Sequence, residues 1–310
     1  MRYRCATSAL SNHSIAVAMP GEGPLPRSQL DARGPSALAA RPCICLGRLP
    51  CVRQDETTAH LGSSFGAVAD EYNRLRPGPS DEALDWLLPT GAADVLEIGA
   101  GTGVLTRLLE QRVRHVTAVE PDDRMRDVLA SRNAAVEVLA GPAEVIPAST
   151  SSYDVVIAAS AWHWVDEDRA VPEVARVLRP SGRLSLVWSG PDRSVDWVRS
   201  LWAGGIIFSP EEQADVDARR RRRHAVNVDI GGLSPFHEPE TALFRWNRPM
   251  TKRDLVALAT TYSALITMEE EDRRRHLDAM ARFLDEHEAF VSQEVIDVPM
   301  RSYCWRATKR

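Results

Sequence analysis

The middle of the chain alternates two kinds of hydrophobic pattern. Short apolar and β-branched runs, typical of buried strands, occupy residues 93–98, 115–119, 135–139, 153–159 and 183–188. Before and between them, apolar positions recur every three or four residues and predict helices at 65–74, 80–88, 103–112, 122–131 and 167–178. This alternation indicates βαβ units stacked on a parallel sheet.

The order of elements changes after residue 190. Residues 179–184 are expected to end a helix and turn the chain into the fifth strand. Beyond it the pattern predicts a helical region, a strand near 241–246, helices near 251–267 and 270–287, and a strand near 295–307. The predicted fold class is therefore α/β: a Rossmann-like, doubly wound, mostly parallel seven-stranded sheet with an antiparallel last strand and a helical insertion after the fifth strand.

The first 58 residues differ from the rest. They contain six prolines and a single aromatic residue, Tyr3, and they show no sustained periodicity. A segment of this composition cannot bury a core, so we expect residues 1–58 to be a disordered extension and residues 59–310 to be the folded domain, with residues 191–240 as a helical substrate cover. A short apolar stretch near the start also resembles part of a secretory signal, but polar residues interrupt it.

Cysteine usage and charge narrow the function classes. Four of the five cysteines lie in the first 51 residues, and the spacing of Cys43, Cys45 and Cys51 departs from the usual zinc pairing, so we expect no metal site. The net charge of −5 gives no reason to expect a nucleic-acid partner, and the arginines at 219–223 follow acidic residues on one predicted helix. No apolar run is long enough to span a membrane, and we expect a cytoplasmic protein.

Three glycines follow the first strand of this domain. Gly99, Gly101 and Gly103 lie where the strand turns into a helix, a place where missing side chains let a ligand lie against bare peptide groups. Glu120 comes 21 residues after Gly99, near the end of the next strand, where a carboxylate can accept both hydroxyls of a ribose. Together these features predict a nucleoside site.

The type of nucleoside follows from the glycine spacing. A dinucleotide fingerprint requires a third glycine where this chain has Val104, and Gly103 comes one place early. The Gly-Lys-Ser/Thr sequence of a phosphate-binding P-loop is absent. A nucleoside ligand without a pyrophosphate is favoured over a nicotinamide dinucleotide.

These motifs resemble a known family. The class I S-adenosylmethionine-dependent methyltransferases, in their small-molecule branch, have a first motif similar to "VLEIGAGTG" and a second-strand acid similar to "AVEPD". The resemblance continues through "AGPAEVIPASTSSYDVVIAASAWHWVD" and "VPEVARVLRPSGRLSLVW", and "SFGAVADEYNRLRPG" is similar to the lead-in helix. It covers residues 62–190, whereas the remainder agrees in element order.

The resemblance implies S-adenosyl-L-methionine as the cofactor and assigns its contacts. The residues implied at the cofactor are Tyr72, Glu97, Gly99, Ala100, Gly101, Gly103, Glu120, Pro121, Ala143, Glu144, Ala159 and Ser160. The glycine loop would pass beneath the methionine part, Glu120 would hold the ribose, and the backbone of Ala143 would meet the adenine. Many relatives have an aspartate for the adenine amine where this chain has Pro142, and Glu144 is a candidate substitute.

The loop after the fourth predicted strand suggests the acceptor pocket. His163 stands between Trp162 and Trp164 at the carboxyl end of that strand, where ligands of such sheets bind. His163 is a candidate general base, and the two tryptophans are candidate walls for a flat or apolar substrate; packing of the loop is the structural alternative. Arg76 and Trp202 are further candidate pocket residues.

The sequence therefore predicts an enzyme that transfers a methyl group from S-adenosyl-L-methionine to a small organic acceptor by direct in-line displacement. Two alternatives are a non-catalytic protein that binds the cofactor or its demethylated product, S-adenosylhomocysteine, and a nicotinamide-dependent oxidoreductase. The acceptor atom and the oligomeric state are not encoded in these patterns.

Overall fold

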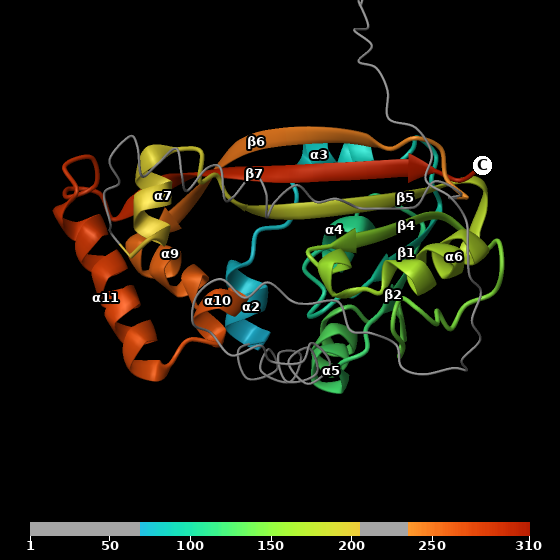
Figure 1. The fold of residues 1–310 in the computed structure, drawn as a ribbon, viewed down its shortest axis with the longest axis horizontal. Coiled ribbons are helices and arrows are strands. Elements are labelled where there is room, and N and C mark those ends of the chain that lie inside the picture. Colours follow the sequence, from blue (N-terminus) through green and yellow to red (C-terminus); the bar gives the residue numbers. More distant parts are fainter. Residues whose placement is uncertain (1–68, 205–234) are drawn as a thin grey trace, which may run out of the picture. The chain divides into compact units, whose positions relative to one another are not determined.

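The computed structural model describes residues 69–204 and 235–310. Within these ranges seven strands form one sheet in the order β3-β2-β1-β4-β5-β7-β6 (Figure 1). The strands are β1 (Asp94–Ile98), β2 (His115–Val119), β3 (Glu137–Leu139), β4 (Tyr153–Ala159), β5 (Leu178–Pro191), β6 (Glu240–Thr251) and β7 (Val295–Thr308). Strands β1 to β5 pair in parallel, and β7 runs antiparallel to both β5 and β6, which confirms the predicted fold class.

The described helices are α2 (Ala69–Leu75), α3 (Asp81–Leu87), α4 (Thr106–Glu110), α5 (Asp123–Arg132), α6 (Glu167–Val177), α7 (Asp196–Trp202), α9 (Lys252–Ala259), α10 (Ser263–Ile266) and α11 (Glu270–Glu286). A short 3-10 turn, η2 (Trp162–Trp164), follows β4. Helix α3 begins where the Ser80 hydroxyl accepts the N–H of Ala83, and α5 begins where the Asp122 carboxylate accepts the N–H of Met125, as side-chain caps do.

Alternation along the central strands gives the sheet two buried faces. Val155 and Ile157 of β4 pack with α3 and α4, whereas Val156 and Ala158 pack with α6. Because successive side chains of a strand point to opposite faces, a strand covered on both sides is apolar throughout, which is the pattern found in the sequence.

A second body of helices lies at one end of the sheet. Helices α7, α9, α10 and α11 gather around the far ends of β6 and β7 (Figure 1). A core of its own joins them to the sheet, with Leu201, Leu258, Leu284 and Met300 among its buried members. Helix α2 packs against α9, and an ion pair of 2.7 Å links Arg74 to Asp254. The sheet and this helical body flank the region in which the candidate site lies.

Some predicted boundaries are wrong. The turn expected at 179–184 lies within β5 rather than before it: Leu178 already pairs with β4, and pairing resumes at Arg183 after unpaired residues that include Ser181 at φ +60°. The helix expected at 251–267 is interrupted between α9 and α10, where the hydroxyls of Thr260 and Thr261 donate to the carbonyls of Ala257 and Leu258. Helix α4 starts at Thr106 rather than at residue 103, because Gly103 adopts a positive φ of 88°.

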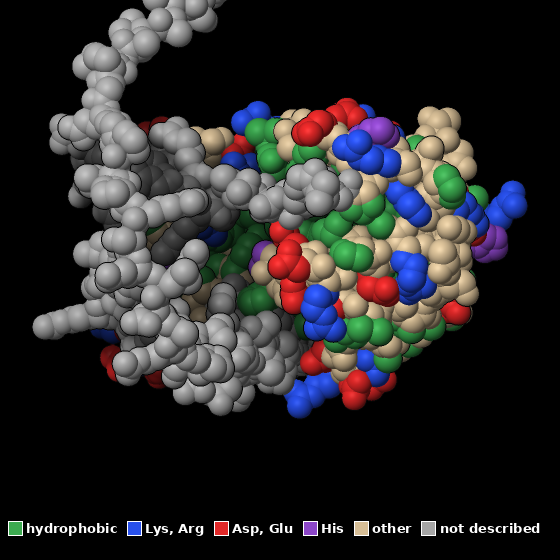
Figure 2. Space-filling view, turned by 45° about the vertical axis from the view of Figure 1, so that its right-hand side comes forward, with side chains coloured by type: hydrophobic (Ala, Val, Ile, Leu, Met, Phe, Trp, Pro, Cys, Tyr) green, Lys and Arg blue, Asp and Glu red, His purple; other side chains and the backbone are tan. Residues whose placement is uncertain are grey.

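Several predictions fall on residues outside the described ranges. They are the extension at 1–58, its cysteines, and the arginines at 219–223. Of the predicted cover at 191–240, the structure describes α7 and the start of β6. Within residues 69–204 and 235–310, no helix is long and apolar enough to cross a bilayer, and no group of three or more His, Cys, Asp or Glu side chains is arranged to hold a metal. Figure 2 shows acidic and basic side chains interspersed on the face it presents.

Candidate functional site

The glycine loop turns sharply between β1 and α4. Gly99, Gly101 and Gly103 have φ values of +62°, +58° and +88°, which L-residues with a Cβ rarely adopt. The N–H groups of Gly99 and Ala100 both donate to the carbonyl of Val119, at 2.8 and 3.3 Å. The loop is thereby fixed across the end of β2, the strand that leads to Glu120.

The space beside the three glycines differs. A Cβ on Gly103 would lie 2.7 Å from both Leu129 and Asn133 of the α5 segment, so this glycine permits close packing of the loop on a helix. Gly103 therefore packs closely on a helix, although it lies one place before the third glycine of a dinucleotide fingerprint. A Cβ on Gly99 would meet Ala161 at 2.6 Å, whereas one on Gly101 would meet only Met125, at 3.8 Å. Of the three, Gly101 has free space beside it.

Glu120 ends β2 and is almost fully buried, with 5% of its surface exposed. One carboxylate oxygen accepts the N–H of Gly101 at 2.8 Å, and the other accepts the N–H of Asp122 at 2.9 Å. Burial raises the pKa of Glu120, while these two hydrogen bonds act in the opposite direction. The carboxylate thus holds the glycine loop, and each oxygen keeps a lone pair for a further donor.

Glu97 is a second buried acid, located in β1 directly before the loop. Its carboxyl accepts a hydrogen bond of 2.6 Å from the Thr106 hydroxyl, and 1% of its surface is exposed. Burial, with a smaller contribution from the charge of Glu120, raises the pKa of Glu97 to about 8. A cation placed beside Glu97 would offset this desolvation and favour the carboxylate.

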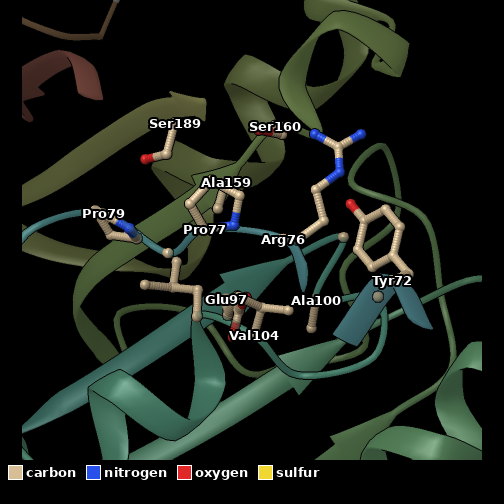
Figure 3. A pocket seen from close by; sticks show the side chains of 14 residues that line it. Tyr72, Arg76, Pro77, Pro79, Glu97, Ala100, Val104, Ala159, Ser160 and Ser189 are labelled. Atoms are coloured by element: carbon tan, nitrogen blue, oxygen red, sulfur yellow. The ribbon is translucent and has the colours of Figure 1, made fainter. Parts of the chain in front are cut away.

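A pocket with about 520 Å³ of empty space, part of it open to solvent, lies over the glycine loop (Figure 3). The lining residues come from α2 and the segment after it, from β1 and its loop, from the end of β4, and from β5: Tyr72, Arg76, Pro77, Gly78, Pro79, Glu97, Gly99, Ala100, Gly101, Val104, Leu105, Ala159, Ser160 and Ser189. The pocket therefore brings seven of the twelve residues predicted at the cofactor, Tyr72 among them, into one lining, together with Arg76, a predicted pocket residue.

The end of β4 contributes a residue in an unusual conformation. Ser160 has φ +52°, which a non-glycine residue seldom adopts, and its N–H donates to Val187 at 2.8 Å. Strained residues of this kind cluster where ligands bind. Ser160 lines the pocket together with Ala159, so the structure places this residue where the sequence predicted it.

The loop after β4 arranges its aromatic residues unequally. Trp162 is buried in the core, and its indole N–H donates to Glu167 at 2.7 Å, whereas 42% of the surface of Trp164 is exposed. The imidazole of His163 lies 4.8 Å from the Trp164 ring, and its Nδ1 accepts a long hydrogen bond of 3.5 Å from Trp188. Desolvation and the nearby charge of Arg76 lower the pKa of His163 to about 4, although part of its surface is exposed, so the ring is neutral at pH 7.

Comparison with known proteins decides the family. A methyltransferase domain model matches residues 96–186. A protein of Mycobacterium tuberculosis, named as an uncharacterized methyltransferase, is 39% identical over 260 residues, which cover 84% of this chain and 99% of the relative. The chain belongs to the class I S-adenosylmethionine-dependent methyltransferases.

Three further similarities agree with this assignment. A Schizosaccharomyces pombe protein, also named as an uncharacterized methyltransferase, is 33% identical over 226 residues, or 69% of this chain and 84% of the relative. A solved structure described as a type II methyltransferase from Anaeromyxobacter dehalogenans superposes with a TM-score of 0.57 at 25% identity, covering 76% of this chain and 97% of that one. A malonyl-[acyl-carrier protein] O-methyltransferase of Pectobacterium atrosepticum is 32% identical over 146 residues, covering 46% of this chain and 57% of the relative.

Other predicted residues of this methyltransferase lie outside the pocket lining. Ala143 is buried in the core, and the Glu144 carboxylate accepts the N–H of Asp166 at 2.7 Å, which ties it to the loop that contains His163. Trp202 packs in the second core, with its ring 6.4 Å from that of Tyr262. The hydrophobic periodicity around Trp202 is explained by this packing.

Sequence reasoning missed several lining residues of the methyltransferase pocket. Pro77, Gly78 and Pro79 follow α2 and pass beside the glycine loop, where a Cβ on Gly78 would lie 2.5 Å from Leu108. Two prolines and a glycine after a helix were an available signal for a fixed turn there. Ser189 had no such signal. It lines the pocket because β5 continues to Pro191, beyond the end of the predicted strand.

Proposed function

We propose that this methyltransferase binds S-adenosylmethionine over its glycine loop and transfers the methyl group to a small organic acceptor by in-line displacement. The observation that supports it most is the buried carboxylate of Glu120, which holds the N–H of Gly101 and retains a lone pair on each oxygen. Two such lone pairs match the two hydroxyls of a ribose. Pro121 follows Glu120 and limits the direction of the chain beside that sugar.

The methionine part of the cofactor fits the pocket beside Glu97. The carboxyl of Glu97 is buried without a cationic partner in hydrogen-bond contact among the described residues, and it lies in the lining with Gly101 and Tyr72. A bound ammonium or sulfonium would convert this costly buried acid into a paired carboxylate. The residues present thus fit a cationic nucleoside.

When bound, S-adenosylmethionine supplies an electrophilic methyl carbon and a neutral thioether as the leaving group. The chain then has to hold the acceptor in line with that carbon and to exclude water, which is an effect of orientation. Ala159, Ser160 and Ser189, at the carboxyl ends of β4 and along β5, are proposed to border the acceptor. We keep Ala143 and Glu144 as the proposed adenine contacts, through the Ala143 backbone and the side chain of Glu144.

His163 has a limited capacity as a base. A neutral imidazole whose Nδ1 accepts the Trp188 N–H carries its proton on Nε2, which leaves no free lone pair unless that long bond is exchanged for one from the acceptor. We therefore propose that His163 orients the acceptor and receives a proton only when the acceptor is an O–H or N–H group that displaces Trp188.

Two measurements test the proposed function. Isothermal titration with S-adenosylhomocysteine is expected to show one saturable site, and incubation with methyl-labelled S-adenosylmethionine and a panel of small organic molecules is expected to label at least one of them. Absence of binding would overturn the proposal. Binding without transfer to any member of a broad panel would instead support a non-catalytic cofactor-binding protein.

A further inference from the structure

Three arginines near the pocket have no carboxylate partner in the described part of the chain. Arg76 donates one hydrogen bond of 2.9 Å to the backbone carbonyl of Thr261, and Arg248 donates at 2.6 Å to that of Leu75. Arg193 lies over the indole of Trp202, 5.6 Å from its centroid. Desolvation lowers the pKa of Arg193 and of Arg248, and the charge of Asp254 acts in the opposite direction on Arg248.

The three guanidinium groups surround one phenol. Tyr262 lies in the turn between α9 and α10, with the guanidinium carbon of Arg76 3.9 Å from its ring centroid, and the charges of Arg76, Arg193 and Arg248 all act on it. The hydroxyl of Tyr262 is shielded from solvent and has no hydrogen-bond partner within the described ranges. The Nε of Arg76 and the indole N–H of Trp202 are in the same state. All three groups can donate a hydrogen bond.

Unused buried donors beside uncompensated cations are unfavourable for folding alone. An unpaired buried donor costs free energy, and a buried charge without a partner costs more. The hydrogen bond to Thr261 uses one terminal nitrogen of Arg76. The Nε of Arg76 and the hydroxyl of Tyr262 remain without a hydrogen-bond partner in the described residues. A bound anion with acceptor oxygens would satisfy both the charge and the donors.

This cluster adjoins the methyl-transfer pocket. Arg76 and Tyr72 line the pocket together with Ser160, and Figure 3 shows them on the side opposite Glu97 and Val104. The Tyr262 hydroxyl lies 3.1 Å from the position that a Cβ on Gly190 would take, next to the lining residue Ser189. An anion held here would be beside the proposed acceptor space and away from Glu97.

We propose that the methyl acceptor is a small organic acid whose carboxylate is bound by Arg76 and Tyr262, with Arg193 and Arg248 supplying further positive charge. This inference rests on the proposed function and adds the substrate class. A carboxylate is favoured over a phosphate because the Nε of Arg76 and the hydroxyl of Tyr262 are two donors for two oxygens, whereas a phosphate presents three or more oxygens to satisfy.

The test uses the full chain saturated with S-adenosylhomocysteine. Malonate, succinate and benzoate are titrated in parallel with the corresponding neutral amides and with inorganic phosphate, and binding heats are measured. We expect at least one acid to bind and its amide to show no heat. Tyr262→Phe, which removes only the hydroxyl, is expected to weaken acid binding roughly 10-fold, and Arg76→Gln roughly 100-fold. S-adenosylhomocysteine affinity should remain unchanged in Tyr262→Phe.

Arg112→Gln is the matched control, because Arg112 pairs with Asp81 away from the pocket. It should bind acid and S-adenosylhomocysteine as the wild type does. Equal binding of acids and amides, tighter binding of phosphate, or acid binding unchanged in both Tyr262→Phe and Arg76→Gln would overturn the inference. Failure of the wild type to bind S-adenosylhomocysteine would overturn the proposed function and this inference together, whereas cofactor-product binding without acid binding overturns the inference alone.

Discussion

The two sides of the pocket differ in the kind of ionisable group that they bury. On the side of the glycine loop lie Glu97 and Glu120, both almost fully buried; on the side of the helical body lie Arg76 and Arg193. Opposite charges buried in one protein usually pair with each other when they serve stability. In the described residues no ion pair joins these acids to these arginines, which agrees with the two proposals above: a cationic nucleoside beside the acids and an anionic acceptor beside the arginines.

The largest effect is expected from a change to the packing that supports the acidic side. Gly103→Ala should lower the free energy of unfolding by about 3 kcal/mol, because a positive φ is unfavourable for alanine and its Cβ would meet Leu129 and Asn133 at 2.7 Å. Thermal unfolding in the absence of ligand measures this loss.

Gly91→Ala is the control that separates the two causes. Gly91 has φ +84°, close to that of Gly103, but nothing lies within 4 Å of the position of its Cβ. It should cost about 1 kcal/mol, from the backbone conformation alone. If the two variants lost the same free energy of unfolding, Gly103 would have no packing role against α5.

Glu120→Ala removes a carboxylate of the acidic side. We expect S-adenosylhomocysteine affinity to fall roughly 100-fold, because charge-assisted hydrogen bonds to the ligand and the bond that holds Gly101 are lost together. Glu120→Gln retains one carbonyl oxygen and should weaken binding less. Isothermal titration measures both, and unchanged affinity in Glu120→Ala would remove the central support of the proposed cofactor site.

Glu97→Gln tests the acidic side through the pH dependence of stability. Since the pKa of Glu97 in the ligand-free fold is raised to about 8, the proton on it contributes stability below about pH 4.5, and this contribution is lost as the pH rises through 8. A glutamine keeps the acceptor for Thr106 without an ionisation, so the ligand-free variant should be more stable than the wild type by about 2 kcal/mol at pH 8 and nearly equal at pH 5. Melting temperatures across this range provide the measurement.

The same variant should bind the cofactor less well. Removing the carboxylate removes the partner of a cationic ligand, so affinity for S-adenosylmethionine should fall in Glu97→Gln while its stability rises. In the wild type, affinity should improve from pH 6 to pH 8 as Glu97 becomes easier to ionise. A variant that is both less stable and pH-independent in binding would show that Glu97 is an ordinary core residue.

The acidic side could be predicted from the sequence, whereas on the basic side the sequence indicated Arg76 as a candidate pocket residue but neither Arg193 nor Tyr262. Gly99, Gly101, Gly103 and Glu120 occur at fixed spacing along two neighbouring strands, so local patterns position them. Arg76, Arg193 and Tyr262 come from three segments far apart in the chain, and their meeting depends on how α2 and α9 dock. The hydrophobic periodicity of a sequence does not indicate contacts of this kind.

Strand lengths likewise depend partly on local sequence and partly on pairing with strands that are distant in the chain. The bounds of β2 and β4 coincide with the predicted 115–119 and 153–159, because short central strands are uniformly apolar. The strand predicted at 241–246 extends instead over Glu240–Thr251, and β5 over Leu178–Pro191. These extensions are fixed by cross-strand pairing with β7 rather than by composition.

The smallest effect is expected at His163, which stands between the two sides. His163→Ala should lower kcat roughly 5-fold, about 1 kcal/mol, and leave the affinity for S-adenosylhomocysteine unchanged, because His163 is proposed to orient the acceptor rather than to bind the cofactor. His163→Gln, which can still accept from Trp188, should recover part of the rate. A fall of 100-fold together with the loss of an ionisation from the pH profile of kcat would instead establish His163 as a base, and would mean that the acceptor atom carries a proton and that the carboxylate serves only for binding.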